Sequence, residues 1–358
     1  MGGWVEGAPA GDRRFLDLPA PVELERGGRL PGVRVAYETW GTLDPDGGNA
    51  VLVEHALTGD SHVVGPAGPG HPTPGWWSGV VGSGAALDTD RFFVVCANVL
   101  GGCQGTTGPS TAAPDGRPWG GRFPEVTVGD QVRVEAALAD ALGIQRFAAV
   151  AGGSMGGMRA LEWAVRYPGR VGALFFLAST AVASADQIGT QTTQQAAVRA
   201  DPRWRDGDYP PDDPPVAGLD VARRIAHLTY RSAGELEARF GSRLQEDGRF
   251  AVASYLQHHG AKLAGRFDAG SYVLLTEAMN TWDVGRGRGG IEAALAGVTA
   301  RALVAGVDSD RLYPVEQQQR VADALGVPLR LIRSPYGHDG FLVETAAVDA
   351  LLRELLGG

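Results

Sequence analysis

Residues 149–168 read AVAGGSMGGMRALEWAVRYP, an aliphatic run that ends in Gly-Gly-Ser-Met-Gly-Gly and continues as an amphipathic segment. This order predicts a buried strand, a sharp turn and a helix, because continuous apolar runs are typical of strands covered on both faces. Glycine costs backbone entropy, so the turn must need a close approach of neighbouring segments. The pattern around Gly152, Ser154 and Gly156 predicts a nucleophile elbow that presents the serine hydroxyl.

Short apolar runs and helical patterns alternate along most of the chain. Strands are predicted at 33–40, 50–56, 91–98, 146–152, 171–179, 301–307 and 328–334, and helices at 128–143, 158–168, 314–326 and 344–356. Strands that alternate with helices form a largely parallel, doubly wound sheet. The sequence therefore predicts an α/β fold.

The alternation is interrupted between residues 184 and 290. Five helical patterns occur there, around a segment rich in proline and aspartate at 207–218. We interpret 184–290 as a mostly helical insertion between two strands of the sheet. The predicted core then consists of residues 1–183 and 291–358.

Composition and charge disfavour several kinds of partner. The chain has 358 residues, 44% of them hydrophobic and 20% charged, as is typical of soluble globular proteins. A net charge of −9 argues against binding to nucleic acid or to an anionic membrane. Since no apolar run reaches the roughly 20 residues of a membrane span and no signal-peptide core is present, we expect a cytoplasmic protein.

Cysteine and lysine usage restricts the chemistry further. Two cysteines cannot build a disulfide framework, and no Cys/His cluster has the spacing of a zinc site, so we expect no metal. Lys262 is the only lysine, which excludes a Gly-Lys-Ser/Thr phosphate loop and leaves one residue for a pyridoxal-phosphate Schiff base. We expect no tightly bound cofactor.

An elbow serine needs a base and an acid, which follow it in the chain order Ser, Asp or Glu, His. His338 alone among the histidines lies beyond the last predicted strands. Asp308 and Asp310 both follow the strand at 301–307, and their spacing leaves the choice between them open. Asp339 is a third carboxylate, but it adjoins the histidine and is poorly placed to orient it.

The oxyanion formed by attack of the serine needs hydrogen-bond donors. The turn directs the Met155 amide toward this position, and the loop after the strand at 50–56 offers the Leu57 amide as a second donor. Cys103 is a rival nucleophile. No elbow surrounds Cys103 and no separate His and acid pair is assigned to it, so we interpret it as an inert thiol.

Seven blocks of the sequence together resemble the homoserine O-acetyltransferases of the α/β-hydrolase fold, most closely the actinobacterial members. The blocks are HALTGDSH, NVLGGCQGTTGPS, GGSMGGMRALEWA, ADQIGTQTTQ, ARRIAHLTYR, SDRLYP and YGHDGFLVE, and the resemblance extends from about residue 30 to the C-terminus. It implies Ser154, Asp310 and His338 as the catalytic triad. It also implies an oxyanion hole at the amides of Leu57 and Met155.

The resemblance further implies the reaction and its substrates. Members of this family transfer an acetyl group from acetyl-CoA, a co-substrate, to L-homoserine through an acyl-serine, which gives O-acetyl-L-homoserine for methionine biosynthesis. Arg223 and Asp339 are implied to hold the amino acid, which fits the pairing of guanidinium with carboxylate and of carboxylate with ammonium. The helices of 184–290 are implied to act as a lid and to form a homodimer.

Several alternatives stay open. Proteins of this fold also use succinyl-CoA or acylate serine, and no residue here separates these reactions. A serine esterase would use the same triad with water and would not need Arg223 and Asp339, whereas an inactive scaffold would not need the triad. The sequence departs from the family pattern at Glu54, where relatives usually carry a small or apolar residue. We expect Glu54 to change the electrostatics beside the oxyanion loop.

Overall fold

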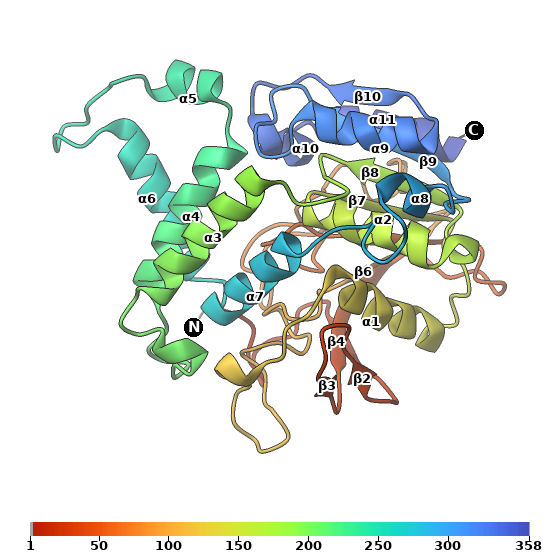
Figure 1. Ribbon diagram of the computed structural model, residues 1–358, viewed down its shortest axis with the longest axis horizontal. Coiled ribbons are helices and arrows are strands. Elements are labelled where there is room, and N and C mark those ends of the chain that lie inside the picture. Colours follow the sequence, from red (N-terminus) through yellow and green to blue (C-terminus); the bar gives the residue numbers. More distant parts are fainter. Residues whose placement is uncertain (1–2, 358) are drawn as a thin grey trace.

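The computed structural model describes residues 3–357, and its centre is an eight-stranded sheet (Figure 1). The strand order is β1-β4-β6-β5-β7-β8-β9-β10. β1 pairs antiparallel with β4, and β4 pairs antiparallel with β6. All pairs from β6 to β10 in this order are parallel. The strands are β1 Arg14–Asp17, β4 Arg34–Trp40, β5 Ala50–Glu54, β6 Phe93–Ala97, β7 Ala149–Gly153, β8 Ala173–Leu177, β9 Arg301–Val307 and β10 Leu329–Ile332.

The seven predicted strands correspond to β4 to β10, and the predicted α/β architecture is confirmed. The sequence did not predict β1 or the small hairpin of β2 (Val22–Glu23) and β3 (Arg29–Leu30), because these segments are short and lack a continuous apolar run. The helices of the core are α1 Val128–Ala141, α2 Met155–Arg166, α8 Ile291–Leu295, α9 Val315–Leu325, α10 Gly340–Val343 and α11 Thr345–Gly357.

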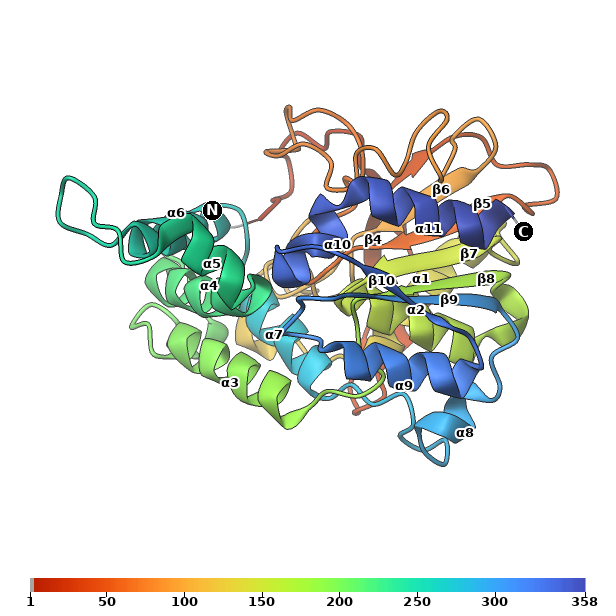
Figure 2. The ribbon, with the colours of Figure 1, turned by 90° about the horizontal axis from the view of Figure 1, so that it is seen from above.

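Helices cover both faces of the sheet (Figure 2). α1, α2 and α9 contribute to one buried apolar cluster, and α11 contributes to the other together with the long segment 63–87. Successive residues of a strand point to opposite faces, so Leu52 of β5 belongs to the first cluster while Val51 and Val53 belong to the second. Burial on both faces explains why these strands are apolar throughout.

Within residues 184–290 the chain forms five α-helices, which match the helical patterns of the predicted insertion. They are α3 Ala185–Arg199, α4 Val216–Tyr230, α5 Ala233–Phe240, α6 Ala251–Ala264 and α7 Ala269–Asn280. α3 to α6 group at one end of the sheet (Figures 1 and 2). The two ends of the insertion lie side by side, because Val182 pairs with Asp283 in an isolated bridge. No helix within residues 3–357 has both the length and the apolar character needed to cross a bilayer.

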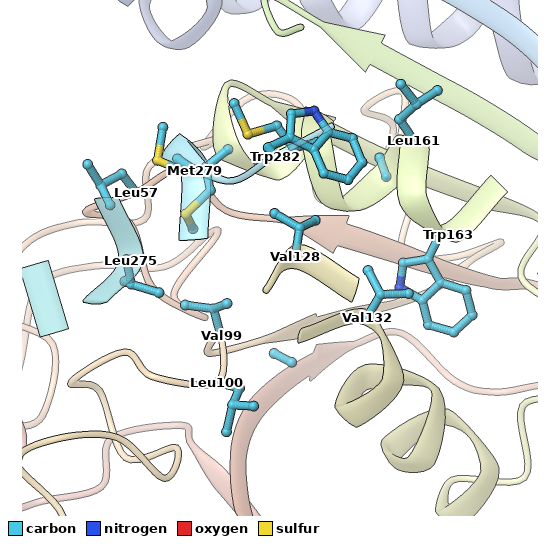
Figure 3. Packing of buried hydrophobic residues seen from close by; sticks show 14 of the residues in the cluster. Leu57, Val99, Leu100, Val128, Val132, Leu161, Trp163, Leu275, Met279 and Trp282 are labelled. Carbon is cyan, nitrogen blue, oxygen red and sulfur yellow. The ribbon is translucent and has the colours of Figure 1, made fainter. Parts of the chain in front are cut away.

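α7 joins the insertion to the main core. Figure 3 shows Leu275 and Met279 of α7 within the same apolar cluster as Val128 of α1 and Leu161 of α2. Leu275 and Leu57 belong to this same buried cluster. Packing of α7 therefore connects the insertion with the loop that follows β5.

Candidate active site

Ser154 lies at the turn between β7 and α2, where the sequence predicts the elbow. Its backbone has φ 59° and ψ −126°, a conformation that side-chain-bearing residues rarely adopt. The Ser154 amide donates to the Leu177 carbonyl at 3.1 Å, and the Ser179 hydroxyl donates to the Ser154 carbonyl at 2.6 Å. These bonds hold the strained turn. The side chain of this residue is enclosed, since Ser154 is only 5% exposed.

The glycines around Ser154 provide space. They are Gly152, Gly153, Gly156 and Gly157, and a Cβ atom on any of them would lie within 2.6 Å of a neighbouring atom. At Gly156 that neighbour is the Glu54 carbonyl oxygen at the end of β5. The elbow therefore sits directly against the adjacent strand, which a larger residue would push away.

His338 connects Ser154 with Asp310. The His338 Nε2 atom lies 2.9 Å from Ser154 Oγ, and its Nδ1 atom lies 2.6 Å from Asp310 Oδ2. Because a carboxylate only accepts hydrogen bonds, Nδ1 carries the ring proton and Nε2 is free to accept the serine proton. The other carboxylate oxygen, Oδ1, accepts from the amides of Leu312 and Tyr313 at 2.8 and 3.0 Å. This arrangement can activate a serine for nucleophilic attack.

The geometry separates the two aspartates that spacing left equivalent. Asp308 Oδ1 accepts from the Ser334 amide at 3.0 Å, and its Oδ2 lies 3.8 Å from Arg333. Asp308 therefore stabilises the loop that follows β10. Of the two, Asp310 is the residue that contacts the imidazole.

Aromatic rings enclose the His338 imidazole. The ring centres of Tyr313 and Phe341 lie 5.1 Å from it, and that of Tyr230 lies 5.9 Å away. Tyr230 is the last residue of α4, so the helical insertion reaches the histidine. His338 itself is buried, which favours a site with restricted access of water.

The two amides predicted for the oxyanion hole are free donors. Met155 is the first residue of α2, so its amide has no partner within the helix. Neither the Met155 nor the Leu57 amide donates a hydrogen bond to an acceptor in residues 3–357. Met155 directly follows the serine, and an unpaired amide beside an activated serine can stabilise a developing oxyanion.

A buried ion network beneath these loops was not predicted. Arg159 of α2 lies 2.8 Å from Glu54 and 2.7 Å from Glu135, and it also donates to the His55 carbonyl at 2.6 Å. Burial raises the pKa of Glu54 well above its usual value, while the positive charge of Arg159 opposes this shift. Arg159 therefore links α2 with the chain segment that leads to Leu57. The partners of Arg159 lie far from it in the sequence, so the spacing of residues could not predict these contacts.

The two residues implied to hold an amino acid lie near the triad. Arg223 of α4 donates to the Thr58 hydroxyl at 3.4 Å, and its guanidinium lies 5.0 Å from the centre of the Tyr230 ring. Asp339 Oδ2 lies 3.2 Å from Arg231 Nε. Burial raises the pKa of Asp339, and Arg231 opposes this shift. Sequence reasoning missed Arg231, which directly follows α4 in an extended conformation and so has no place in the helical pattern that contains Arg223.

Cys103 is buried, and its Sγ accepts from the Asp268 amide at 3.4 Å. Burial raises the pKa of the Cys103 thiol, and the nearby Asp268 carboxylate raises it further. A thiol attacks as its thiolate, which this environment disfavours. The geometry therefore supports Ser154 over Cys103 as the nucleophile.

A second group of side chains has the composition of a metal site. Ligand atoms of Asp12, Glu38, His62 and His71 lie within 4.8 Å of one another. However, the rings of His62 and His71 stack with centres 3.8 Å apart and planes 11° apart. Ring-nitrogen lone pairs lie in the ring plane, so two stacked rings cannot both point at one ion. His71 Nε2 also already accepts from the Asp12 amide at 3.0 Å. We assign no metal to this group.

This chain is similar to proteins of known fold and activity. The α/β-hydrolase fold family matches residues 49–345. Homoserine O-acetyltransferase of Thermobifida fusca is 62% identical over 367 residues, which cover 99% of this chain and 96% of that protein. The structure of homoserine O-acetyltransferase from Bacillus anthracis has a TM-score of 0.89 at 25% identity, covering 97% of this chain and 98% of that one. Esterase E22 has a TM-score of 0.89 at 26% identity, with coverage of 96% and 99%.

Proposed function

Because this chain belongs to the homoserine O-acetyltransferase family of α/β-hydrolase-fold acyltransferases, we propose that it transfers an acetyl group from acetyl-CoA to L-homoserine. The product is O-acetyl-L-homoserine, which serves methionine biosynthesis. The observation that carries the choice of acceptor is Arg223, a guanidinium without a carboxylate partner in residues 3–357 that contacts the loop next to Leu57. An esterase that uses water has no need of such a group.

In the first half-reaction, Ser154 attacks the thioester carbonyl of acetyl-CoA. His338 Nε2 takes the hydroxyl proton as the bond from Oγ to carbon forms. The amides of Leu57 and Met155 stabilise the resulting oxyanion. The carbon–sulfur bond then breaks, and the protonated His338 returns the proton to the departing CoA sulfur. Asp310 stabilises the imidazolium between these two transfers.

In the second half-reaction, the L-homoserine hydroxyl attacks the acetyl-serine. His338 removes the hydroxyl proton and then returns it to the Ser154 oxygen as the ester is released. Arg223 binds the carboxylate of the amino acid, and Asp339 binds its ammonium group through the oxygen that Arg231 leaves open. Both charges of the substrate then have a partner.

We further propose that residues 184–290 act as a lid that excludes bulk water from the acetyl-serine. The Ser232 hydroxyl donates to the Pro335 carbonyl at 2.6 Å, and the Gln187 side chain donates to the Leu312 carbonyl at 2.7 Å. These bonds hold the lid against the loops that carry His338 and Asp310. Exclusion of water favours an alcohol acceptor over hydrolysis.

The lid also exposes large apolar side chains, which supports the proposal of a homodimer through its helices. Val221 and Leu228 are exposed seven residues apart on α4, and Leu244 and Phe250 are exposed between α5 and α6. Exposed apolar side chains of this size are typical of interfaces when they gather on one surface. Light scattering is expected to give twice the mass of one chain, and a monomer at micromolar concentration contradicts the dimer.

Release of CoA tests the proposed function directly. With acetyl-CoA alone, we expect a burst of CoA equal to the enzyme concentration, and continued turnover only when L-homoserine is added. The peptide that contains Ser154 should gain the mass of one acetyl group. Steady release of CoA without L-homoserine supports the esterase alternative. Faster turnover with succinyl-CoA or with L-serine supports the corresponding transferase.

Replacing Arg223 by alanine is expected to separate the two half-reactions. Arg223 does not contact the acetyl group in the proposed mechanism, so the CoA burst should persist. The kcat/KM for L-homoserine should fall at least about 30-fold, because a charged group loses its partner in a partly desolvated site. Arg223→Lys should restore little, since an ammonium cannot make the paired contacts of a guanidinium. An Arg223→Ala enzyme that acetylates L-homoserine normally shows that Arg223 is misassigned.

A further inference from the structure

We infer that Arg266 is a second arm of the acceptor site, so that Arg223, Arg266 and Thr58 together bind the substrate carboxylate. This inference rests on the proposed function for the identity of the acceptor. It adds a residue that sequence motifs did not indicate, and it explains why two cations from different parts of the lid meet at one point.

Both guanidinium groups converge on Thr58. Arg266 lies in the turn between α6 and α7, and its Nη2 donates to the Thr58 carbonyl at 3.0 Å. Arg223 approaches from α4 and donates to the hydroxyl of the same residue at 3.4 Å. Thr58 directly follows Leu57, whose amide is assigned to the oxyanion hole. Arg223 also contacts the Tyr230 ring, whose centre lies 5.9 Å from that of the His338 ring, so the two cations lie on the side of the lid that faces the triad.

Neither cation is neutralised by the protein. Within residues 3–357, no carboxylate oxygen lies within 4.0 Å of Arg223 or Arg266, whereas the neighbouring Arg224 pairs with Asp220 and Arg231 pairs with Asp339. The Nε atom of Arg223 is buried without an acceptor. A buried donor without a partner costs free energy, and a bound anion would satisfy it.

The electrostatics of Arg266 agree with an anion site. Burial lowers the pKa of Arg266, and the positive charge of Arg223 lowers it further, with partial opposition from Asp60. Two positive charges at half-buried positions repel each other, and an anion bound between them offsets this repulsion. A carboxylate has two oxygens and can accept from both guanidinium groups at once.

The position of the site favours the carboxylate of the acceptor over a phosphate of the donor. In L-homoserine only three carbons separate the carboxylate from the hydroxyl, so a site for this carboxylate belongs beside the loops that surround the acetyl-serine. In acetyl-CoA the whole pantetheine arm separates the phosphates from the thioester. A phosphate beside Leu57 would require that arm to fold back on itself.

The test compares L-homoserine with 3-aminopropan-1-ol, which is homoserine without its carboxylate. Arg266→Met keeps most of the side-chain volume and removes the charge. It should lower kcat/KM for L-homoserine at least about tenfold, and change kcat/KM for 3-aminopropan-1-ol by less than about twofold. The CoA burst from acetyl-CoA should stay unchanged. Arg199→Met, at an exposed position in the last turn of α3, is the matched control and should behave like the wild type.

Two kinetic outcomes would overturn the inference. Equal losses for both acceptors would show that Arg266 only supports the lid. A slower burst with acetyl-CoA, but not with the phosphate-free thioester S-acetyl-N-acetylcysteamine, would show that the anion is a phosphate of the donor.

A titration independent of catalysis separates failure of the site from failure of the proposed function. L-Homoserine is titrated calorimetrically into Ser154→Ala protein, with and without Arg266→Met. We expect the second change to weaken binding at least about tenfold. Equal binding by both proteins overturns the inference. A wild-type enzyme that acylates no amino alcohol refutes the proposed function, and this titration still decides whether Arg266 binds the amino acid.

Discussion

Replacing Ser154 by alanine is expected to abolish acetyl transfer while the fold stays intact. The hydroxyl oxygen is the atom that forms the acyl-enzyme, and His338 Nε2 contacts no other hydrogen-bond donor among the described residues. Loss of a triad serine lowers kcat by about 10⁴-fold or more in enzymes that share this chemistry. Both the CoA burst and the acetyl mass on the Ser154 peptide should disappear, while the circular dichroism spectrum should match that of the wild type.

Ser154→Gly is the informative companion of the alanine variant. The backbone φ of 59° strains any residue with a Cβ, whereas glycine adopts it freely. The glycine variant should therefore be inactive but more stable than Ser154→Ala, by about 1 kcal/mol in the free energy of unfolding. Transfer that persists in either variant, or acetylation of another peptide, shows that Ser154 is not the nucleophile.

Changing Asp310 to asparagine is expected to lower kcat by about 10³- to 10⁴-fold. The amides of Leu312 and Tyr313 both donate to Oδ1, so the asparagine should place its carbonyl oxygen there. Its NH₂ group then faces His338 Nδ1 and forces the ring proton onto Nε2. In that tautomer the imidazole cannot accept the proton of Ser154. Nitrogen NMR of the His338 ring should report the changed tautomer.

Asp308→Asn provides the matched control, because this residue has the same chemistry two positions earlier. Asp308 accepts from the Ser334 amide and does not contact the imidazole, so the change should alter kcat by less than about threefold. A larger loss in Asp308→Asn than in Asp310→Asn refutes the assignment of the acid.

Local patterns were sufficient for most of the fold. The strands β4 to β10 are apolar runs because both faces of the sheet are covered. In the lid, apolar residues recur at the spacing of a helix, which predicted its helices. β1 escaped prediction because its four residues, RFLD, are mostly exposed and pair at the edge of the sheet. Ser154 was also predictable, since the close approach of β5 and α2 demands glycine at fixed positions around it.

Contacts between distant segments decided the rest. Asp308 and Asp310 follow the same strand, and their spacing left the choice between them open, whereas the packing of the His338 loop brings only Asp310 of the two to the imidazole. Arg266 lies 208 residues from Thr58 in the sequence, so no periodicity or motif joins them. A motif describes the geometry of one short turn of the chain, and here it predicted the elbow that carries Ser154. The acid partner and the convergence of two cations on the oxyanion loop depend on how the lid and the sheet pack, because those distances exist only in the folded chain.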